Sequence, residues 1–303
     1  MLAAETVDLW KIYSRGAKRI EALRGVSVKI SENTITSLLG RNGAGKTTFI
    51  RILGTQLLPT KGEAYVLGYD VVREASLVRE RIAVLPQEAQ PLMFPSPLEY
   101  VKYVLVMRGM SLSDAEKQSK SALEEMGIPR KYWNRSVWSL SGGYRRRVLL
   151  ALLFAMNAEL VFLDEPSIGL DPIARRSLWN KILSFRKRGI TIILTTHYME
   201  EAYILSDYVV VIHEGKVIGY DTPRNLVENL PVKYKVIVLN DCAELSKLKL
   251  DADFTVGSSP PYTLYYKQIE NALEISRSLN VKDCNIKIEP VNLEDYLIIK
   301  TSG

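Results

Sequence analysis

Residues 40–47 read GRNGAGKT, and they lie between a predicted strand at 34–39 and a segment with the pattern of a helix. The spacing G-x-x-x-x-G-K-T in a strand–loop–helix context is typical of a backbone cradle for phosphate oxygens. Gly40 and Gly45 let amide groups curl around an anion, and the helix start adds a favourable dipole. Lys46 would place a compact positive charge on the terminal phosphates. The Thr47 hydroxyl can join the ligands of Mg²⁺.

Short β-type runs alternate with helical segments along most of the chain. Candidate strands are residues 26–30, 34–39, 81–85, 160–163, 190–195 and 208–213. Several are apolar throughout, which favours parallel strands buried on both faces. The segment VVVIHEGKVIGYD predicts a hairpin with its turn at Glu214-Gly215. These patterns predict an α/β fold with a mostly parallel sheet.

The domain organisation follows from two changes of pattern. Residues from about 91 to 138 are helical in pattern and form an insert in the α/β core; their second helical segment is predicted to open with a capping box from Ser113 to Glu116. A boundary near Thr222-Pro223 separates a main domain, residues 1–222, from a small α+β domain, residues 223–303.

Composition limits the function classes. The 303 residues are 47% hydrophobic with a formal net charge of +6, as expected of a mildly basic globular protein or of one that binds nucleotide, nucleic acid or an anionic membrane. The longest apolar run, residues 148–156, is too short to span a bilayer, so a membrane role requires a partner chain. Cys242 and Cys284 have no CxxC spacing, which argues against structural zinc and favours reduced thiols.

Two adjacent carboxylates, Asp164 and Glu165, end the apolar strand at 160–163. Carboxylates at the end of a buried strand are costly unless they face a charged ligand. Asp164 is therefore predicted to hold Mg²⁺ through its water, and Glu165 to polarise the water that attacks a γ-phosphate. The alternative is that Asp164 only caps the next turn.

Two further polar residues follow predicted strands. Gln87 comes after the strand at 81–85 and is placed to reach Mg²⁺ or the attacking water. His197 ends the strand at 190–195 and is placed to bind the γ-phosphate and orient Glu165. A solvated glutamine and a structural histidine are the alternatives.

The segment LSGG, residues 140–143, precedes three arginines and a long apolar run. Ser141, Gly142 and Gly143 give a helix start with almost no side chains, which suits docking of an anion. A glycine-rich helix start without a ligand is the alternative.

The order of phosphate loop, glutamine, LSGG, acidic strand and histidine closely resembles the nucleotide-binding subunit of the ATP-binding cassette (ABC) family over residues 5 to 222. The resemblance implies a phosphate-loop NTPase core with a mostly parallel sheet, an N-terminal antiparallel β subdomain and a C-terminal α+β extension. It implies that the helical subdomain, about 91–138, grips a transmembrane partner. It also implies that LSGG acts in trans: two ATP molecules are sandwiched between two subunits, and each phosphate loop faces the partner's LSGG.

The resemblance also carries over individual residues. Tyr13 aligns with the aromatic that stacks on adenine, although a core tyrosine is the alternative. Asp171 is the acid of the loop SIGLD, which crosses the dimer interface. The implied nucleotide-binding residues are Tyr13, Gly40, Asn42, Gly43, Ala44, Gly45, Lys46, Thr47, Thr48, Ser141, Gly142, Gly143 and Asp171. The implied catalytic residues are Glu165, His197, Gln87 and Lys46, and the implied metal ligands are Thr47, Gln87 and Asp164.

Three positions depart from the family pattern, namely Arg41, Tyr144 and Ile168, and none touches the phosphate or metal chemistry directly. Arg146 is expected to pack or pair within the core. The ending NLEDYLIIKTSG resembles ATPase subunits of the drug, antibiotic and polysaccharide export branch, with a plain solubilising tail as the alternative.

The implied function is an ATP-hydrolysing subunit that energises an ABC transporter, an exporter by its tail, through ATP-driven dimer closure. Its cofactors would be ATP and Mg²⁺, and its partner a separate integral membrane permease at the cytoplasmic face of the cell membrane. Both halves of a site are present in one chain, which favours a homodimer. The alternative is a soluble ABC-type ATPase that acts on ribosomes or nucleic acid. The single cassette and the gap of about ninety residues without sustained heptads argue against it, so no nucleic acid partner is expected.

Overall fold

The computed structural model describes residues 1–16, 18–240, 252–257, 259–280 and 284–301. Contacts divide the chain into two compact units, Met1–Tyr220 and Asp221–Gly303. The division falls close to the boundary that the sequence suggests at Thr222-Pro223. In the described part of the chain, every helix is too short or too polar to cross a bilayer.

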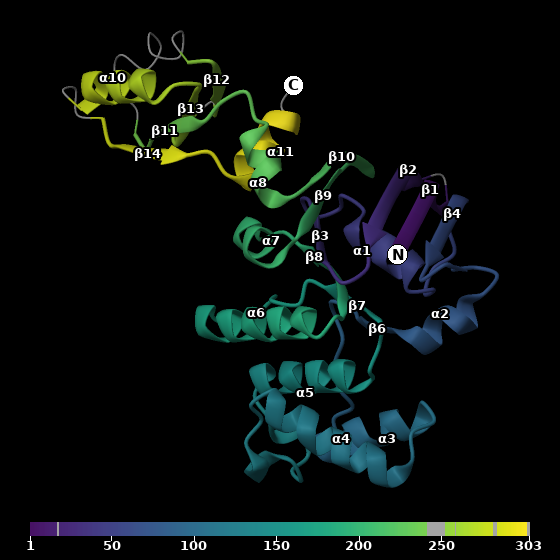
Figure 1. Cartoon of the computed structure of the whole chain (residues 1–303). Helices are drawn as coiled ribbons and strands as arrows, with labels where there is room; N and C mark the ends of the chain where they lie inside the picture. Colours follow the sequence, from purple (N-terminus) through teal and green to yellow (C-terminus); the bar gives the residue numbers. More distant parts are fainter. Residues whose placement is uncertain (17, 241–251, 258, 281–283, 302–303) are drawn as a thin grey trace. The chain divides into compact units, whose positions relative to one another are not determined.

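The first unit is built on a six-stranded sheet with the order β10-β9-β3-β8-β7-β6 (Figure 1). Its strands are β3 (Ile35–Leu39), β6 (Ile82–Leu85), β7 (Leu160–Asp164), β8 (Thr191–Thr196), β9 (Tyr208–His213) and β10 (Lys216–Asp221). Every pairing among β9, β3, β8, β7 and β6 is parallel. All residues of β3, β7 and β8 are buried, as expected for a sheet covered on both faces. The predicted parallel core is confirmed.

The predicted hairpin between β9 and β10 is also present. Its turn residues, Glu214 and Gly215, have φ angles of 45° and 78°. Two successive positive φ angles are typical of the turns that match the twist of paired strands.

A second, antiparallel sheet has the order β2-β1-β4-β5. It consists of β1 (Leu2–Arg15), β2 (Lys18–Ser31), β4 (Lys61–Val66) and β5 (Tyr69–Asp70). The candidate strand at 26–30 is part of β2. The sequence patterns did not predict β1, because register shifts between Thr6, Leu9 and Lys11 interrupt its alternation.

The helices of this unit flank the central sheet or form the insert. They are α1 (Lys46–Leu53), α2 (Ala75–Arg81), α3 (Pro97–Met107), α4 (Leu112–Glu125), α5 (Gly142–Ala155), α6 (Pro172–Lys187) and α7 (Met199–Leu205), with short 3-10 turns η1 (Arg130–Tyr132) and η2 (Val137–Ser139). Helices α3, α4 and α5 lie side by side in Figure 1.

The predicted capping box at Ser113 and Glu116 is wrong. Helix α4 begins two residues earlier than that box requires, because Ser111 is its N-cap and accepts a hydrogen bond from the amide of Asp114 over 3.2 Å. Glu116 instead pairs with Lys120 one turn on. A capping box does occur at the start of α3, between Ser96 and Glu99.

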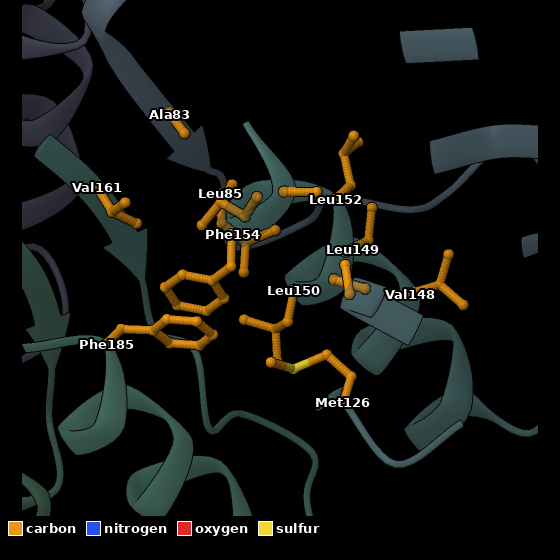
Figure 2. Packing of buried hydrophobic residues seen from close by; sticks show 14 of the residues in the cluster. Ala83, Leu85, Met126, Val148, Leu149, Leu150, Leu152, Phe154, Val161 and Phe185 are labelled. Atoms are coloured by element: carbon orange, nitrogen blue, oxygen red, sulfur yellow. The ribbon is translucent and has the colours of Figure 1, made fainter. Parts of the chain in front are cut away.

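Helix α5 joins the insert to the sheet through a shared apolar core. Figure 2 shows the ring of Phe154 lying face to face with that of Phe185 from α6, and the two ring centres are 3.3 Å apart. Leu150 on the same helix and Met126 after α4 belong to this cluster, as does Leu85 of β6. This packing anchors the second half of α5 against α6 and the neighbouring sheet edge.

The second unit is α+β. Its described strands are β11 (Tyr234–Val238), β12 (Phe254–Val256), β13 (Tyr262–Tyr266) and β14 (Ile286–Pro290), in the order β12-β13-β11-β14, with helices α8 (Pro223–Glu228), α10 (Ile269–Asn280) and α11 (Leu293–Thr301). Both β13 and β14 pair antiparallel with β11, so α10 connects two strands that flank a third, a split β-α-β arrangement.

A buried ion pair anchors the last helix of this unit. Lys235 donates to Asp295 Oδ2 over 2.8 Å, and the Tyr265 hydroxyl donates to Asp295 Oδ1 over 2.8 Å. Burial and the nearby Asp295 carboxylate raise the pKa of Tyr265. The segment NLEDYL is therefore part of a folded helix, which does not fit a plain solubilising tail.

The expectation that both cysteines carry reduced thiols can be tested for one of them. Cys284 is disulfide-bonded, so the expectation of reduced thiols is wrong for this residue. Cys242 lies outside the described residues.

Candidate nucleotide-binding and hydrolysis site

Four neighbouring strands of the central sheet end at the same edge, and each is followed by a predicted site residue. Residues directly opposite one another in the register include Asp164 and Thr195 at the ends of β7 and β8. The residues that follow are Gly40 after β3, Gln87 after β6, Glu165 after β7 and His197 after β8. The carboxyl edge of a parallel sheet is where ligands bind in such folds, so the topology brings these residues together.

The phosphate loop requires glycine for steric reasons. A Cβ atom at Gly40 would lie 2.2 Å from the carbonyl oxygen of Ile212, and one at Gly45 would lie 2.3 Å from that of Ala22. Gly45 also has a φ of 108°, which disfavours other residues. Helix α1 starts directly after it, so its free amide groups point toward the loop.

Lys46 is buried, and its side chain folds back over the loop. Its ammonium group donates to the carbonyl of Gly40 over 2.8 Å and to that of Arg41 over 3.2 Å. Burial lowers the pKa of Lys46, and the nearby carboxylates of Glu165 and Asp164 oppose that shift. A buried cation next to an open loop would gain from contact with phosphate oxygens.

Asp164 does not cap the following turn. Its Oδ1 accepts hydrogen bonds from the hydroxyl of Thr47 over 3.1 Å and from the hydroxyl of Thr195 over 2.5 Å. The carboxylate is buried. The structure thus brings the predicted metal ligands Asp164 and Thr47 together.

Glu165 has its carboxylate between two of the predicted residues. Gln87 Nε2 donates to Glu165 Oε2 over 3.4 Å. His197 Nδ1 lies 3.2 Å from the same oxygen, but the alignment is not that of a hydrogen bond, and this buried nitrogen has no hydrogen-bond partner in the structure. The three side chains could therefore share a water or phosphate oxygen.

An open depression of about 390 Å³ contains this edge of the sheet. Its lining residues are Tyr13, Ile20, Ala22, Asn42, Gly43, Gly45, Lys46, Thr47, Thr48, Gln87 and Glu165. Tyr13 is 38% exposed, and its hydroxyl lies 3.4 Å from Thr48 Oγ1, so it is not a core tyrosine. Ala44, another predicted contact, has a buried side chain, which leaves only its backbone for a ligand.

The LSGG segment starts α5 as expected. Ser141 is the N-cap and accepts a hydrogen bond from the amide of Tyr144 over 3.4 Å. A Cβ atom at Gly142 or Gly143 would meet nothing within 4 Å, so no other part of the chain packs against the side-chain positions of these two glycines. Ser141 and Gly143 line a separate hollow of about 200 Å³, and the structure does not bring them together with Lys46.

Asp171 occupies a capping position. Its Oδ1 accepts hydrogen bonds from the amides of Ile173 and Ala174, each over 2.9 Å, at the start of α6. A role of Asp171 across a dimer interface remains a prediction.

Sequence reasoning did not identify Thr195 as part of the site. Thr195 links the two acids, because its hydroxyl donates to Asp164 and accepts the amide hydrogen of Glu165 over 2.9 Å. The available signal was a threonine at the end of a buried strand that would adjoin the acidic strand in the sheet. Arg146, expected to pack or pair in the core, donates to the carbonyls of Glu165 and Pro166.

The comparison with known proteins agrees with this arrangement. Residues 23–168 match a family model described as ABC transporter. The Doxorubicin resistance ATP-binding protein DrrA of Mycobacterium tuberculosis (strain ATCC 25618 / H37Rv) is 37% identical over 238 residues, which cover 78% of this chain and 71% of that protein. The Retinal-specific phospholipid-transporting ATPase ABCA4 of Homo sapiens is 36% identical over 202 residues, 67% of this chain but only 9% of that protein.

Solved structures give the same fold. The structure of cbiO1 from Clostridium perfringens, part of the ABC transporter complex cbiONQ, has a TM-score of 0.67 and 28% identity, covering 75% of this chain and 91% of that one. A dimeric ATP-binding cassette bound to ADP and Pi in a post-hydrolysis state has a TM-score of 0.67 and 24% identity, covering 72% of this chain and 98% of that one. The latter likeness shows the fold alone.

These relatives do not favour the alternative of an ATPase for ribosomes or nucleic acid. The confirmed phosphate-loop fold, the family model and the identity with DrrA lead to one conclusion. The chain belongs to the ABC transporter family, as an ATP-binding subunit that hydrolyses ATP.

Proposed function

We propose that two copies of this chain close on two ATP molecules, with Lys46 of one copy and Ser141 of the other gripping the same triphosphate. The observation that carries the proposal is the separation of these two anion sites. Lys46 lines the depression at the sheet edge, whereas Ser141 and the bare start of α5 line another hollow. A second copy can bring its own helix start to the first copy's phosphate loop, because an isologous pair completes both sites at once.

The residues at the sheet edge fit Mg²⁺ that is held jointly with a nucleotide. Thr47 and Asp164 supply hard oxygen ligands, and Gln87 can add an amide oxygen. Mg²⁺ binds such sites through one or two protein ligands plus substrate phosphates. When bound, Mg²⁺ neutralises charge that develops on the phosphate oxygens.

The proposed chemistry assigns the remaining roles. Lys46 and the loop amides hold the β- and γ-phosphates in place. Glu165 takes the proton of the water that attacks the γ-phosphorus, Gln87 orients that water, and His197 holds a γ-phosphate oxygen through the nitrogen that has no hydrogen-bond partner. Tyr13 stacks on the adenine ring from the rim of the depression.

An exposed apolar surface on the insert is the proposed contact with a separate membrane permease. We call it the Phe94 surface: Leu92, Phe94 and Trp138, which are 64%, 94% and 68% exposed. Two backbone hydrogen bonds hold it together, from Trp138 to Met93 over 3.0 Å and from Val137 to Pro95 over 3.1 Å. Large exposed aromatics on a fixed backbone mark an interaction site. This contact would place the chain at the cytoplasmic face of the cell membrane.

The direction of transport is proposed as export. The ending NLEDYL resembles the exporter branch, and the printed name of DrrA ties that relative to drug resistance. In this chain Asp295, the second acid of the LED motif, accepts a hydrogen bond from Lys235 and so anchors α11. The resemblance to the exporter branch therefore includes a residue that stabilises the second unit.

Copurification tests the proposed function. The chain would be purified from its host membranes in mild detergent, and a permease with several membrane spans should accompany it. The variant Phe94→Ser/Trp138→Ser should lose that permease but keep ATP hydrolysis. Leu58→Ser, an exposed apolar control away from the insert, should keep both. Salt-dependent copurification of RNA or DNA in place of a permease would contradict the proposal.

A further inference from the structure

Glu165 adopts a backbone conformation that a glutamate seldom takes. Its φ is 47°, in the left-handed region, which is strained for a residue other than glycine and persists only where the surroundings impose it. On its amide side, the hydroxyl of Thr195 accepts the hydrogen bond described above. The conformation determines where the carboxylate points, so whatever holds it also positions the proposed base.

Arg146 holds the carbonyl side of the same residue, Glu165. Its Nη2 donates to the carbonyl oxygen of Glu165 over 3.3 Å, and its Nε donates to that of Pro166 over 3.4 Å. Burial lowers the pKa of Arg146, with the Asp164 carboxylate opposing the shift. A planar guanidinium that binds two successive carbonyls fixes their relative orientation, which a single ammonium cannot do.

The two neighbouring arginines point elsewhere. Arg145 donates to the carbonyls of Val137 and Trp138, and Arg147 donates to that of Gly127. Both therefore tie α5 to the insert. Of these three arginines, Arg146 is the one that reaches the loop after β7.

The backbone of Arg146 is held in place by its helix. It lies in the second turn of α5, the helix whose first amides are the proposed contact for the partner copy's γ-phosphate. Leu150, one turn further along, and Phe154 anchor α5 in the core (Figure 2). The helix start and Arg146 belong to one helix, so a displacement of the start relative to this anchor would be transmitted through the guanidinium to the Glu165 backbone.

We propose that Arg146 is a positioning residue for ATP hydrolysis: it connects the anion-binding start of α5 to the backbone of Glu165, so that docking of the partner's ATP sets the direction of the Glu165 carboxylate. This inference rests on the proposed function. In the proposed dimer, the start of α5 contacts the ATP that is bound to the partner's phosphate loop, whereas Glu165 acts on the ATP bound to its own. Arg146 would therefore connect the two ATP sites of the dimer.

Arg146→Gln compared with Arg147→Gln tests the proposal. Loss of the two carbonyl contacts should lower kcat by about 10- to 100-fold with little change in KM for ATP, because misplacement of a reacting group by about 1 Å has that effect. Arg146→Lys should recover only part of kcat. Arg147→Gln should stay within about twofold of the unsubstituted chain.

A second measurement separates positioning from folding. In a Glu165→Gln background, ATP-driven dimer formation should be the same with and without Arg146→Gln, because binding does not need the base. A kcat of Arg146→Gln equal to that of the unsubstituted chain, or an equal loss of dimer formation, would overturn the inference. Failure of the proposed function is distinguishable, since Glu165→Gln alone would then form no ATP-driven dimer.

Discussion

The indole nitrogen of Trp179 donates a hydrogen bond to Oε1 of Glu201 over 2.8 Å, deep in the first unit. Both side chains are buried, and the hydroxyl of Ser167 donates to the same oxygen. The three residues come from α6, α7 and the loop after Glu165. The contact thus fixes the loop that leads from the proposed base to Asp171.

Glu201→Ala should destabilise the protein by about 1–3 kcal/mol, because it leaves the buried hydroxyl of Ser167 without its acceptor and leaves the indole of Trp179 with only the longer contact to Ser167 Oγ, over 3.3 Å. The midpoint of urea unfolding measures this. Glu200→Ala is the matched control, since Glu200 is the exposed neighbour on α7, and should change the free energy of unfolding by less than about 0.5 kcal/mol. Equal effects of the two substitutions would show that the buried contact contributes nothing.

Glu165→Gln should lower the rate of Mg²⁺-dependent ATP hydrolysis by about 10²–10⁴-fold, because the amide cannot take a proton from water. Binding of ATP should persist, since Lys46 and the loop amides remain. The measurement is steady-state phosphate release, with Glu159→Gln, at the opposite end of β7, as the control. A rate near that of the unsubstituted chain would refute the role of Glu165.

Gly142→Asp separates the structural role of the helix start from its proposed ligand role. An aspartate in the first turn of α5 should leave stability unchanged or raise it by about 0.3–1 kcal/mol through the helix dipole. It should nevertheless abolish ATP-driven dimer formation, because it repels the incoming γ-phosphate. Gly142→Asn, of similar size but uncharged, should retain more dimer. Full dimer formation by the aspartate variant would argue against anion docking there.

The pH dependence of stability should report the burial of Lys46. Its folded pKa lies below the ordinary 10.5, so between the two values the unfolded chain binds more protons than the folded one. Stability attributable to this residue therefore rises as pH increases through that window. Urea unfolding at a series of alkaline pH values measures the free energy of unfolding. This free energy should rise with pH in Lys61→Met, an exposed control, and should rise less in Lys46→Met. Identical slopes would mean that Lys46 is not desolvated.

Much of the fold could be predicted because its signals are local. The apolar runs that became β3, β7 and β8 need no partner to be recognised, and the phosphate loop carries its own strand and helix. Strand β1 was not predictable in this way, because its bulges break the alternation. The start of α4 was misplaced by two residues, since two serines near it offer similar caps and only the packed helix selects Ser111.

The candidate site likewise has residues that are recognisable from sequence and residues that only the structure identifies. Lys46, Asp164 and Glu165 are recognisable from sequence because each stands at a fixed offset from a strand. Thr195 and Arg146 act through contacts 31 and 19 residues away along the chain, which depend on strand order and helix placement. The sequence predicts only that Arg146 packs or pairs within the core, and the structure shows that, of the three arginines after LSGG, it is the one that donates to Glu165.

The shared grip on ATP is tested most directly by mixing two inactive variants, Lys46→Ala and Ser141→Arg. In a mixed pair, one site combines an intact phosphate loop with an intact helix start, while the other site has lost both. Random pairing should therefore restore about a quarter of the unsubstituted hydrolysis rate, since half the pairs are mixed and each has one working site. No recovery at any mixing ratio, from two variants that are each folded, would contradict a site built from two chains.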